Sequence, residues 1–428
     1  MTTTLRLGIA GLGTVGTGVV RIVQRHAALL AGRTGREITI SAVSARTRDK
    51  DRGVRLQGYE WEDDPVALAR RDDVDVFVEL MGGSDGPAKA AVEAALGLGK
   101  DVVTANKAML AIHGQALAEQ AEARGAALRF EAAVAGGIPV VKALTEGLAG
   151  NEITRVMGVM NGTCNYILTR MEDAELPYDE VFEEARALGY LEADPTLDVG
   201  GIDAGHKLAL LASIAFGTQV DFGAMKLEGI ERISIDDIRQ AADMGYRIKL
   251  LGVAQMTGRG LMQRMSPCLV PADSPLGQLE DAMNMVVLEG DSVGQIVLRG
   301  AGAGEGPTAS AVMSDIVDIA RGTRLSTFGK PAASLSPVEK ATTSTPAPYY
   351  LRMTLEDKPG ALAKIATALG AEGISIDRMR QYGHEDKTAP VLIVTHRTAR
   401  PALDAALQGM AETGVIVGEP VALRIESV

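Results

Sequence analysis

The stretch LRLGIAGLGTVGTGVVRIVQ, residues 5–24, decides the fold of the first part of the chain. An apolar run typical of a strand turns through Gly11, Gly13 and Gly16 and continues with the 3.6-residue periodicity of a helix. Gly11 permits the tight turn, Gly13 lets the backbone approach a pyrophosphate, and Gly16 lets the helix pack on the strand. The helix start offers free N–H groups and the positive end of a dipole. The pattern predicts a dinucleotide-binding site.

Four further stretches have the composition of strands, and helix-like stretches separate them. The strand-like stretches are residues 38–45, 74–80, 101–105 and 127–132, and the helix-like ones include 86–99 and 105–123. Strands that alternate with helices predict a parallel, doubly wound sheet, which is the context that the glycine motif requires. In the alternative interpretation, the glycines only satisfy turn geometry in another kind of α/β domain.

The end of the second predicted strand bears on the choice of cofactor. An NAD-selective site usually carries an acidic side chain there, which binds the ribose hydroxyls. The sequence SARTRDK, residues 44–50, instead offers Arg46, Arg48 and Lys50, with Asp49 as its one acid. Because guanidinium groups suit a 2′-phosphate, the segment favours NADP over NAD. Basic residues on a solvated loop are the alternative.

With 428 residues, 46% of them hydrophobic, the chain is long enough for two or three domains with sizeable cores. No run of about 18 apolar residues occurs and signal-peptide features are missing, so we expect a cytoplasmic protein without a membrane span. The formal charge of −12 argues against a nucleic-acid partner. Cys164 and Cys268 lack the paired spacing of a zinc or iron–sulfur site.

Residues 189–208, GYLEADPTLDVGGIDAGHKL, gather several acidic residues ahead of an apolar helix. Asp203 and Lys207 stand four residues apart at the start of that helix, so they lie on one face. An exposed pair of this kind contributes only about 0.3–0.5 kcal/mol. The residues that follow are apolar nearly all round, which predicts a buried helix whose polar first turn opens into a cavity. In a cleft, a carboxylate beside an ammonium is suited to proton transfer or to polarising a carbonyl.

Six motifs follow one another between about residues 5 and 325: GLGTVGTG, VELMGG, TANKAML, FEAAVAGGIP, NGTCNYILT and GYLEADPTLDVGGIDAGHKL. In this order they resemble the long, regulated form of homoserine dehydrogenase, and together they are far more specific than any one of them. The resemblance implies the NAD(P)-dependent interconversion of L-homoserine and L-aspartate 4-semialdehyde, on the route from aspartate to threonine, methionine and isoleucine.

The resemblance also implies a reason for the concentration of acids. In the family, the position that matches Glu192 binds the amino group of homoserine, and those that match Asp198 and Asp203 line the substrate pocket. A zwitterionic substrate needs anionic partners for its ammonium group, which agrees with these roles. For Asp198, a structural role is an equal alternative. Gly162 and Thr163, from the NGT motif, are expected to line the same pocket.

Lys207 and Lys107 match the two lysines that the family places near the reacting carbon. An ammonium can stabilise and protonate the alkoxide that forms from an aldehyde, and a neutral lysine can accept the hydroxyl proton in oxidation. We assign the proton donor and acceptor to Lys207, beside Asp203, and a substrate and cofactor contact to Lys107. The exchanged roles and two structural ion pairs are the alternatives. His206 is expected to pack, and Asp194 to cap or brace its loop.

The segment FEAAVAGGIP, residues 130–139, is glycine-rich at the end of a strand, where backbone carbonyls can bind a hard cation. The resemblance implies a sodium or potassium ion here, bound mostly by backbone oxygens. The implied ligands are Glu131, Val134, Gly136 and Ile138. A tight interdomain turn without an ion is the alternative.

Residues 294–320 again run from a strand through glycines into a helix, which by itself is compatible with a second dinucleotide site. No alternating strands and helices follow, so we expect the chain to return to the first domain and lay this helix against the cofactor site, as in the family. Gly304 and Thr308 then lie near the cofactor. The expected cofactor contacts are Gly11, Gly13, Thr14, Val15, Gly16, Arg46, Lys50, Lys107 and Gly304.

Residues 326–348 are rich in Ser, Thr, Pro and Ala with little periodicity, which indicates a linker. Residues 349–428 then read as strand, helix, strand, strand, helix, strand, the order of a ferredoxin-like domain. With DKPGALAKIATAL at its first turn, this part resembles an ACT domain, a module that binds amino acids. Asp357 and Gly360 are expected to meet the effector, which by pathway analogy is threonine. Retention for assembly alone is the alternative.

The expected domains are a Rossmann dinucleotide-binding domain at 1–140, completed by 302–325; an α+β substrate and dimerisation domain at 141–301; a linker at 326–348; and an ACT domain at 349–428. Two other functions stay open. Aspartate-semialdehyde dehydrogenase forms a cysteine thioester, for which Cys164 is the candidate. A nonenzymatic amino-acid sensor would use the same domains for binding alone. By the resemblance, the assembly is a homodimer or homotetramer.

Overall fold

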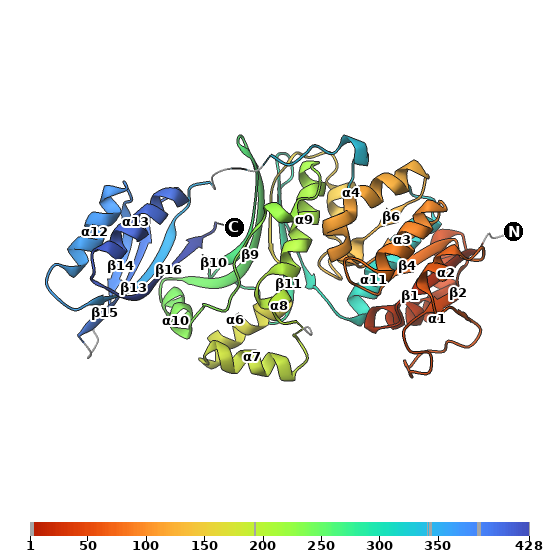
Figure 1. The fold of residues 1–428 in the computed structure, drawn as a ribbon, viewed down its shortest axis with the longest axis horizontal. Coiled ribbons are helices and arrows are strands. Elements are labelled where there is room, and N and C mark those ends of the chain that lie inside the picture. The colour runs from red at the N-terminus through yellow and green to blue at the C-terminus, as the bar shows by residue number, and fades with distance from the viewer. Residues whose placement is uncertain (1–3, 192–193, 340, 342–344, 383–386, 428) are drawn as a thin grey trace.

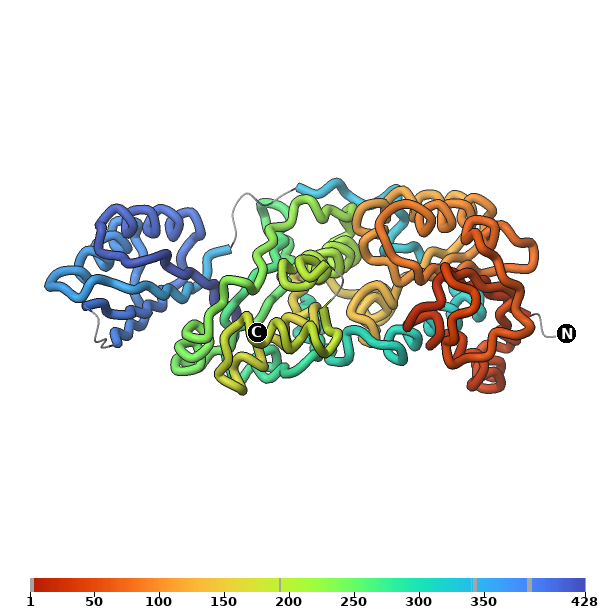
Figure 2. Tube along the Cα trace, turned by 60° about the horizontal axis from the view of Figure 1, so that its bottom comes forward, coloured from red at the N-terminus to blue at the C-terminus, as the bar shows by residue number. Residues whose placement is uncertain are grey.

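The structure, a computed structural model, describes residues 4–191, 194–339, 341, 345–382 and 387–427. Figure 1 shows three bodies in a row, with the N-terminal part at one end, the C-terminal part at the other and a body of long strands between them. The view of Figure 2 shows the same order. In the part of the chain that is described, no helix combines the length and the apolar character needed to cross a bilayer.

The N-terminal body is a six-stranded parallel sheet in the order β3-β2-β1-β4-β5-β6. Its strands are β1 (Leu5–Ala10), β2 (Ile38–Ser44), β3 (Glu60–Trp61), β4 (Val76–Glu79), β5 (Asp101–Thr104) and β6 (Leu128–Arg129). Its helices are α1 (Thr14–Thr34), α2 (Pro65–Arg70), α3 (Pro87–Gly97) and α4 (Lys107–Ala123). The predicted doubly wound sheet is confirmed. The edge strand β3 was not predicted, because two residues carry no periodicity.

Both faces of this sheet are buried, which explains why its strands are nearly continuous apolar runs. On one face, Ile9 of β1 packs in a core with Val19 of α1. On the other face, Phe77 of β4 packs in a core with Leu68 of α2 and Val92 of α3. The helices therefore hold the carboxyl ends of the strands together at one edge, where a doubly wound sheet binds its ligands.

The middle body contributes long antiparallel strands to a second sheet of ten strands. Its strands are β7 (Ile153–Val159), β8 (Lys226–Leu227), β9 (Tyr246–Thr257), β10 (Gly260–Pro271), β11 (Met283–Gly290) and β12 (Gly294–Ala301). A short helix η1 (Glu131–Ala133) precedes this body, and its own helices are α5 (Val140–Lys142), η2 (Ala143–Gly147), α6 (Gly162–Ala174), α7 (Tyr178–Ala187), α8 (Thr196–Val199), α9 (Ile202–Phe216), η3 (Phe222–Ala224) and α10 (Ile235–Asp243).

Helix α11 (Glu305–Ala320) returns to the N-terminal body, as the sequence predicted. Val312 and Ile316 are buried in the core that also contains β1 and α1. The approach is close, because a Cβ added at Gly18 of α1 would lie 2.9 Å from the Cβ of Ala309. The second glycine-rich segment therefore serves the first dinucleotide fold and does not build another one.

The first half of the predicted linker is packed, not loose. Phe328 is 1% exposed, and its ring lies 5.5 Å from that of Phe130. A short helix η4 (Ala332–Ser334) follows, and Ser336 forms an isolated bridge with Thr218. These contacts could not be predicted from the polar, aperiodic sequence, because a single phenylalanine gives no periodic signal.

The C-terminal body has the predicted ferredoxin-like fold, with strands in the order β16-β13-β15-β14. Its elements are β13 (Tyr349–Glu356), α12 (Ala361–Ala371), β14 (Ile376–Gln381), β15 (Thr388–Thr395), α13 (Arg400–Glu412) and β16 (Ile416–Ile425). Its sheet is not separate from the middle body. The last residues of β16 pair with β10 of the same chain, Arg424 with Cys268 and Ile425 with Leu269. The β16 edge is therefore occupied by this chain, and β14 forms the outer edge.

Candidate active site

A cleft of about 550 Å³ lies where the Rossmann sheet meets the middle body. The first turns of α1, α4, α6, α9 and α11 all contribute residues to its walls. Helix N-termini carry unsatisfied N–H groups and the positive end of the helix dipole. Their convergence makes the cleft suited to a ligand that carries phosphate or carboxylate groups.

The carboxylate of Asp203 bridges the two lysines of the cleft. Its Oδ2 lies 2.6 Å from the Nζ of Lys207, and its Oδ1 lies 2.9 Å from the Nζ of Lys107. Lys207 also donates a hydrogen bond of 2.8 Å to the carbonyl oxygen of Met160. The pairing of Asp203 with Lys207, predicted from their spacing, is confirmed. Nothing in the sequence indicated that Lys107, from the other body, shares the same carboxylate.

The charge of Asp203 is fixed by its neighbours. Burial opposes ionisation, but the ammonium groups of Lys207 and Lys107 outweigh it and hold the pKa of the Asp203 carboxyl well below its usual range. An ammonium has three N–H donors, and those of Lys207 have Asp203 and Met160 as partners among the described residues. One donor of Lys207 is therefore left for an oxygen atom of a bound molecule.

Asn161 organises the floor of the cleft and was not singled out in the sequence. Its Oδ1 caps α6 by accepting a hydrogen bond from the backbone N–H of Cys164 at 2.8 Å. Its Nδ2 donates to Asp198 at 3.0 Å and to Asp203 at 3.4 Å. An asparagine directly before a helix is a typical N-cap, so the capping role was readable from the sequence. Its contacts with two distant acids were not.

Asp198 is 4% exposed and lines the cleft. Its backbone carbonyl accepts a hydrogen bond of 3.2 Å from the thiol of Cys164. That thiol is fully buried, and burial together with the nearby Asp198 and Asp203 carboxylates raises its pKa well above the ordinary value. A buried, protonated thiol is a poor nucleophile, which argues against the thioester chemistry of aspartate-semialdehyde dehydrogenase.

Two further expected substrate contacts lie at the end of α6 that faces the cleft. Gly162 and Thr163 both line the cleft. A Cβ at Gly162 would lie 2.5 Å from the carbonyl oxygen of Ala282, so only glycine fits this turn. The hydroxyl of Thr163 donates to the carbonyl oxygen of Tyr190 at 2.9 Å. Glu192 lies outside the described residues.

Two residues expected to have structural roles have them. Asp194 accepts a hydrogen bond of 3.1 Å from the backbone N–H of Thr196, which braces the turn into α8. The His206 ring packs against Phe222 with ring centres 4.2 Å apart, and burial lowers the pKa of His206. Neither residue lines the cleft.

The glycine turn before α1 fits a dinucleotide. Gly11 has a φ of +100°, and a Cβ there would lie 2.4 Å from the carbonyl oxygen of Leu80. A Cβ at Gly16 would lie 2.0 Å from the carbonyl oxygen of Gly11. Around Gly13, by contrast, nothing lies within 4 Å of the added carbon. Two glycines are therefore required by packing, and the third leaves open space where a pyrophosphate can approach the backbone. The neighbouring residues at the start of α1 are the exposed Thr14 and Val15, which lines the cleft.

The start of α11 adds a second glycine turn to the cleft. Gly304, with a φ of +112°, caps α11, and both it and Thr308 line the cleft. A Cβ at Gly302 would collide with the side-chain amide of Asn284. Asn284 is 1% exposed and its Oδ1 accepts no hydrogen bond from any described residue. This residue of the cleft wall was missed in the sequence, and its unpaired acceptor is shielded from solvent.

Arg52, which no sequence motif marked, ties down the loop after β2. Arg46 and Lys50, the predicted cofactor contacts, are exposed there. Arg52 donates from Nε to the carbonyl oxygen of Leu12 at 3.1 Å and from Nη1 to that of Lys50 at 2.8 Å. Its guanidinium also lies over the ring of Trp61 at 5.7 Å. Arg52 thus joins the basic loop to the glycine turn.

The predicted cation segment holds a buried carboxylate with defined partners. Glu131 accepts backbone hydrogen bonds from Val141 at 3.0 Å and Lys142 at 2.8 Å. Burial and the neighbouring Asp315 carboxylate raise the pKa of Glu131 to about 7. Gly136, with a φ of +52°, approaches the 302–303 backbone too closely for any side chain.

The other two expected cation ligands, Val134 and Ile138, are buried. The carbonyl oxygen of Ile138 accepts a hydrogen bond of 2.8 Å from the N–H of Val140. The described residues contain no group of three or more His, Cys, Asp or Glu side chains arranged to hold a metal ion. Any ion here would therefore rely on backbone oxygens and on Glu131.

The expected effector residues lie at the opposite end of the molecule from the cleft. Asp357 and Gly360 are exposed in the turn between β13 and α12. Gly360 caps α12 with a φ of +87°, a conformation that side chains rarely adopt. The turn is formed as expected for an ACT domain.

Comparisons with known proteins agree with this architecture. Family models match in chain order: "Homoserine dehydrogenase, NAD binding domain" at residues 11–131, "Homoserine dehydrogenase" at 139–317 and "ACT domain" at 349–410. A homoserine dehydrogenase of Neisseria gonorrhoeae is 42% identical over 435 residues, which cover 99% of each chain.

Two solved structures extend the likeness to the fold. The crystal structure of a homoserine dehydrogenase from Thiobacillus denitrificans has a TM-score of 0.93 at 38% identity and covers 100% of this chain and 99% of its own. A hyperthermophilic archaeal homoserine dehydrogenase in complex with NADPH has a TM-score of 0.63 at 25% identity and covers 75% of this chain and 99% of its own.

The full-length relatives, the matching folds and the two lysines on one carboxylate point to a single activity. It is the oxidoreductase reaction that interconverts L-homoserine and L-aspartate 4-semialdehyde with a nicotinamide dinucleotide. The chain belongs to the homoserine dehydrogenase family.

Proposed function

We propose that Lys207 is the proton donor and acceptor of this reaction and that NADP is the preferred cofactor. The observation that carries the first proposal is the carboxylate of Asp203, which bridges Lys207 at 2.6 Å and Lys107 at 2.9 Å. A bound nicotinamide dinucleotide would supply the hydride chemistry at the carbinol carbon of homoserine.

Lys207 acts at the oxygen on that carbon. Its side chain is only 11% exposed, and Asp203 and Met160 fix the direction of Nζ. In reduction, the ammonium stabilises the developing alkoxide and then protonates it. In oxidation, a neutral Lys207 accepts the proton of the substrate hydroxyl.

Lys107 has a different task. Its side chain is 29% exposed, compared with 11% for Lys207, and it follows β5 at the carboxyl edge of the Rossmann sheet. A more accessible ammonium on the cofactor side is better suited to orienting the substrate and cofactor than to holding one defined proton.

The acids of the cleft bind the ammonium group of the zwitterionic substrate in this proposal. Asp198 is held by Asn161 on the cleft wall. Glu192, which lies outside the described residues, is assigned to the ammonium group by its place in the sequence motif alone. The helix start at Gly162 offers N–H donors for the substrate carboxylate. Charged hydrogen-bond partners of both signs select an amino acid over a simple alcohol.

Two observations support the preference for NADP. The loop after β2 presents Arg46, Arg48 and Lys50, and the acid of the segment, Asp49, is exposed. In addition, the archaeal relative was solved with NADPH. A 2′-phosphate is bound well by guanidinium groups, whereas a ribose diol needs a carboxylate.

Further proposals concern the cation and the effector. A sodium or potassium ion near Glu131, Val134, Gly136 and Ile138 would offset a buried carboxylate that otherwise resists ionisation. The Asp357–Gly360 turn binds threonine, whose carboxylate suits the start of α12.

We also propose a cytoplasmic homodimer or homotetramer. The outer strands of the ten-stranded sheet, β12 and β14, carry the exposed apolar residues Val297 and Met379. Exposed strand edges are suited to pairing between copies. Within each copy, we keep the domain boundaries near residues 140, 301, 325 and 348.

The experiment that tests the catalytic assignment is a set of initial rates of homoserine oxidation, followed by formation of the reduced cofactor. Wild type, Lys207→Met and Lys107→Met are measured with NADP and with NAD, with and without millimolar threonine. We expect Lys207→Met to lose kcat and Lys107→Met chiefly to raise KM. A loss of kcat in Lys107→Met with a raised KM in Lys207→Met would exchange the two roles. A higher kcat/KM with NAD than with NADP would overturn the cofactor preference.

A further inference from the structure

A second cavity, of about 670 Å³, lies between the middle body and the ACT domain. One wall comes from β8 and β10, and the other from β13, β16 and the start of α13. It occupies the edge of β10 between two short pairings: with β8 at Arg264 and Met265, and with β16 at Cys268 and Leu269. Neither Asp357 nor Gly360 lines it.

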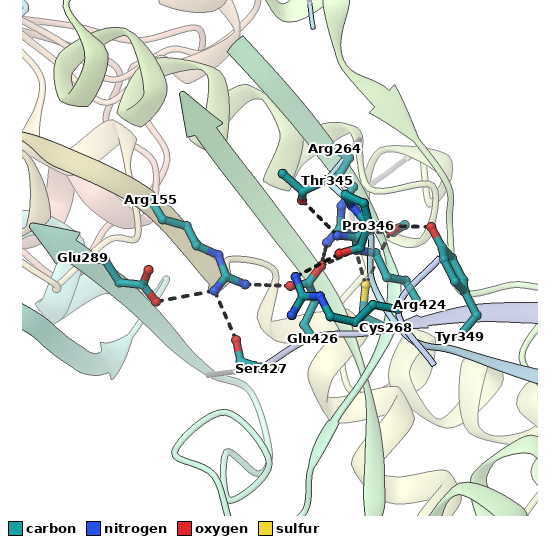
Figure 3. A network of polar contacts seen from close by, with 12 residues as sticks. Arg155, Arg264, Cys268, Glu289, Thr345, Pro346, Tyr349, Arg424, Glu426 and Ser427 are labelled. Carbon is teal, nitrogen blue, oxygen red and sulfur yellow. Dashed lines mark hydrogen bonds and ion pairs between the residues drawn. The ribbon is translucent and has the colours of Figure 1, made fainter. Parts of the chain in front are cut away.

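The inner end of this cavity is part of the polar network in Figure 3. Glu426, at the end of the ACT domain, accepts hydrogen bonds from Arg264, from Arg424 at 2.5 Å and from Arg155 at 2.6 Å. Arg155 has a second carboxylate, Glu289, at 3.4 Å. Three guanidinium groups therefore share two carboxylates. Among the described residues that Figure 3 labels, one positive charge has no carboxylate of its own.

Arg264 places a buried guanidinium group at the inner end of the cavity. It is 8% exposed and lines the cavity, and its Nε has no hydrogen-bond partner in the described part of the chain. Arg424, 9% exposed, lines the same end, where it donates to the hydroxyl of Tyr349 at 3.2 Å. Arginine stays charged when buried, so the two guanidinium groups give this end of the cavity a fixed positive charge.

The rim of the cavity carries both signs of charge. Its charged residues are Lys226, Arg232, Arg400, Glu228, Glu231 and Asp404. Arg400 pairs with Asp404 at 2.7 Å. A mixed rim disfavours a polyanion, whereas a small molecule with one carboxylate and one ammonium finds partners for both groups.

We propose that this cavity binds a free amino acid, with its carboxylate on Arg264 and Arg424 and its ammonium toward Glu228 and Glu231. The site is distinct from the helix-start turn of the ACT domain. Because its two walls belong to the middle body and to the ACT domain, an occupant favours the arrangement in which the two are joined.

The test is calorimetric titration of the full-length protein with L-threonine, L-isoleucine and L-methionine. The amino alcohol that corresponds to each binder serves as the control without a carboxylate. We expect at least one of the three amino acids to bind and its amino alcohol not to bind. Absence of binding by all three, or equal binding of an amino alcohol, would overturn the proposal.

Three variants locate the binding. Arg264→Gln removes a charged partner and should weaken binding by about tenfold or more. Since it also strips Glu426 of a partner, the decisive variant is Ala422→Phe, which fills the cavity from β16 and leaves every arginine in place. Asp357→Asn changes only the threonine turn proposed above, so it should keep the binding that Ala422→Phe removes.

The outcomes separate this inference from the proposed function. Binding lost in Ala422→Phe and kept in Asp357→Asn supports the interdomain site. The opposite pattern overturns it and leaves the threonine proposal intact. The rate of homoserine oxidation without any added amino acid, measured on the same samples, reports independently on the catalytic assignment.

Discussion

Two places in the molecule solve the same electrostatic problem with different residues. In the active-site cleft, the buried carboxylate of Asp203 is shared by Lys107 and Lys207. At the joint with the ACT domain, the buried carboxylate of Glu426 is shared by three arginines. Each site therefore joins two bodies of the chain through one acid.

The difference between lysine and arginine separates their functions. A lysine can release and regain a proton near neutral pH when its surroundings allow, whereas an arginine stays protonated in proteins. The Asp203 cluster therefore contains the residue type that the proposed role of Lys207 in proton transfer requires. The Glu426 cluster can only hold charges in place, which suits a joint and an anion site.

The largest expected effect comes from exchanging these residue types. Lys207→Arg keeps the positive charge beside Asp203 but removes the proton that can be transferred, so kcat should fall by about 10²–10⁴-fold. The matched exchange in the other cluster is Arg155→Lys, which lies on β7 and lines neither cavity. It should change kcat by less than about twofold.

Initial rates in both directions of the reaction measure this contrast. Circular dichroism of each variant serves as the control for folding. Near-wild-type kcat in Lys207→Arg would show that charge alone is required and would leave Lys207 without a role in proton transfer.

The next effect concerns stability. Glu426→Gln leaves the buried guanidinium groups of Arg264 and Arg424, and the partly buried one of Arg155, without their shared carboxylate. The free energy of unfolding should therefore fall by about 3 kcal/mol. Glu289→Gln is the matched control, because the Glu289 side chain is 29% exposed and pairs with one arginine. It should lower the free energy of unfolding by only about 0.5 kcal/mol. Urea unfolding of both variants measures the difference. Equal losses would mean that the joint depends on apolar packing and not on this network.

The comparison also shows what a sequence can predict. The Rossmann turn and the Asp203–Lys207 pair depend on residues that are close in the chain, so their spacing predicted them. The pairing of Lys107 with Asp203 depends on how two bodies meet. No local pattern records that geometry.

The joint with the ACT domain was invisible for the same reason. Arg155, Arg264 and Glu426 look like ordinary charges on alternating strands, and their convergence follows from the pairing of β16 with β10. A sequence with a recognisable ACT motif predicted the domain but not that its last strand extends the neighbouring sheet. The Oδ1 of Asn284, which is buried without a hydrogen-bond donor among the described residues, likewise results from tertiary packing and leaves no trace in the sequence.

A smaller effect on stability is expected at a third buried site, where the carboxyl groups of Glu131 and Asp315 lie close together. Glu131 has a pKa of about 7 in the fold against an ordinary value of 4.5, because of burial and the neighbouring Asp315 carboxylate. The folded protein thus binds this proton more tightly than the unfolded chain. The free energy of unfolding should therefore fall as pH rises from about 4.5 to about 7, by on the order of 1–3 kcal/mol.

Glu131→Gln, which cannot ionise, should lack this part of the pH dependence. Urea unfolding at several pH values in potassium chloride and in choline chloride measures it. If an ion binds at Glu131, potassium should reduce the loss in wild type and leave the variant unchanged. Identical pH profiles for wild type and variant would contradict the raised pKa.

The smallest expected effect concerns Cys164, and it separates a residue that takes part in the reaction from one that only packs beside the site. Cys164 lies within reach of the active-site acids, yet its thiol donates to the carbonyl oxygen of Asp198 and is fully buried. In Cys164→Ser, the hydroxyl can make the same hydrogen bond, so kcat/KM for homoserine should stay within about threefold of wild type. A thioester mechanism predicts instead that activity is abolished. The rate of Cys164→Ser therefore decides whether Cys164 takes part in the reaction. An active variant would limit the proposed chemistry to the two lysines that share the Asp203 carboxylate.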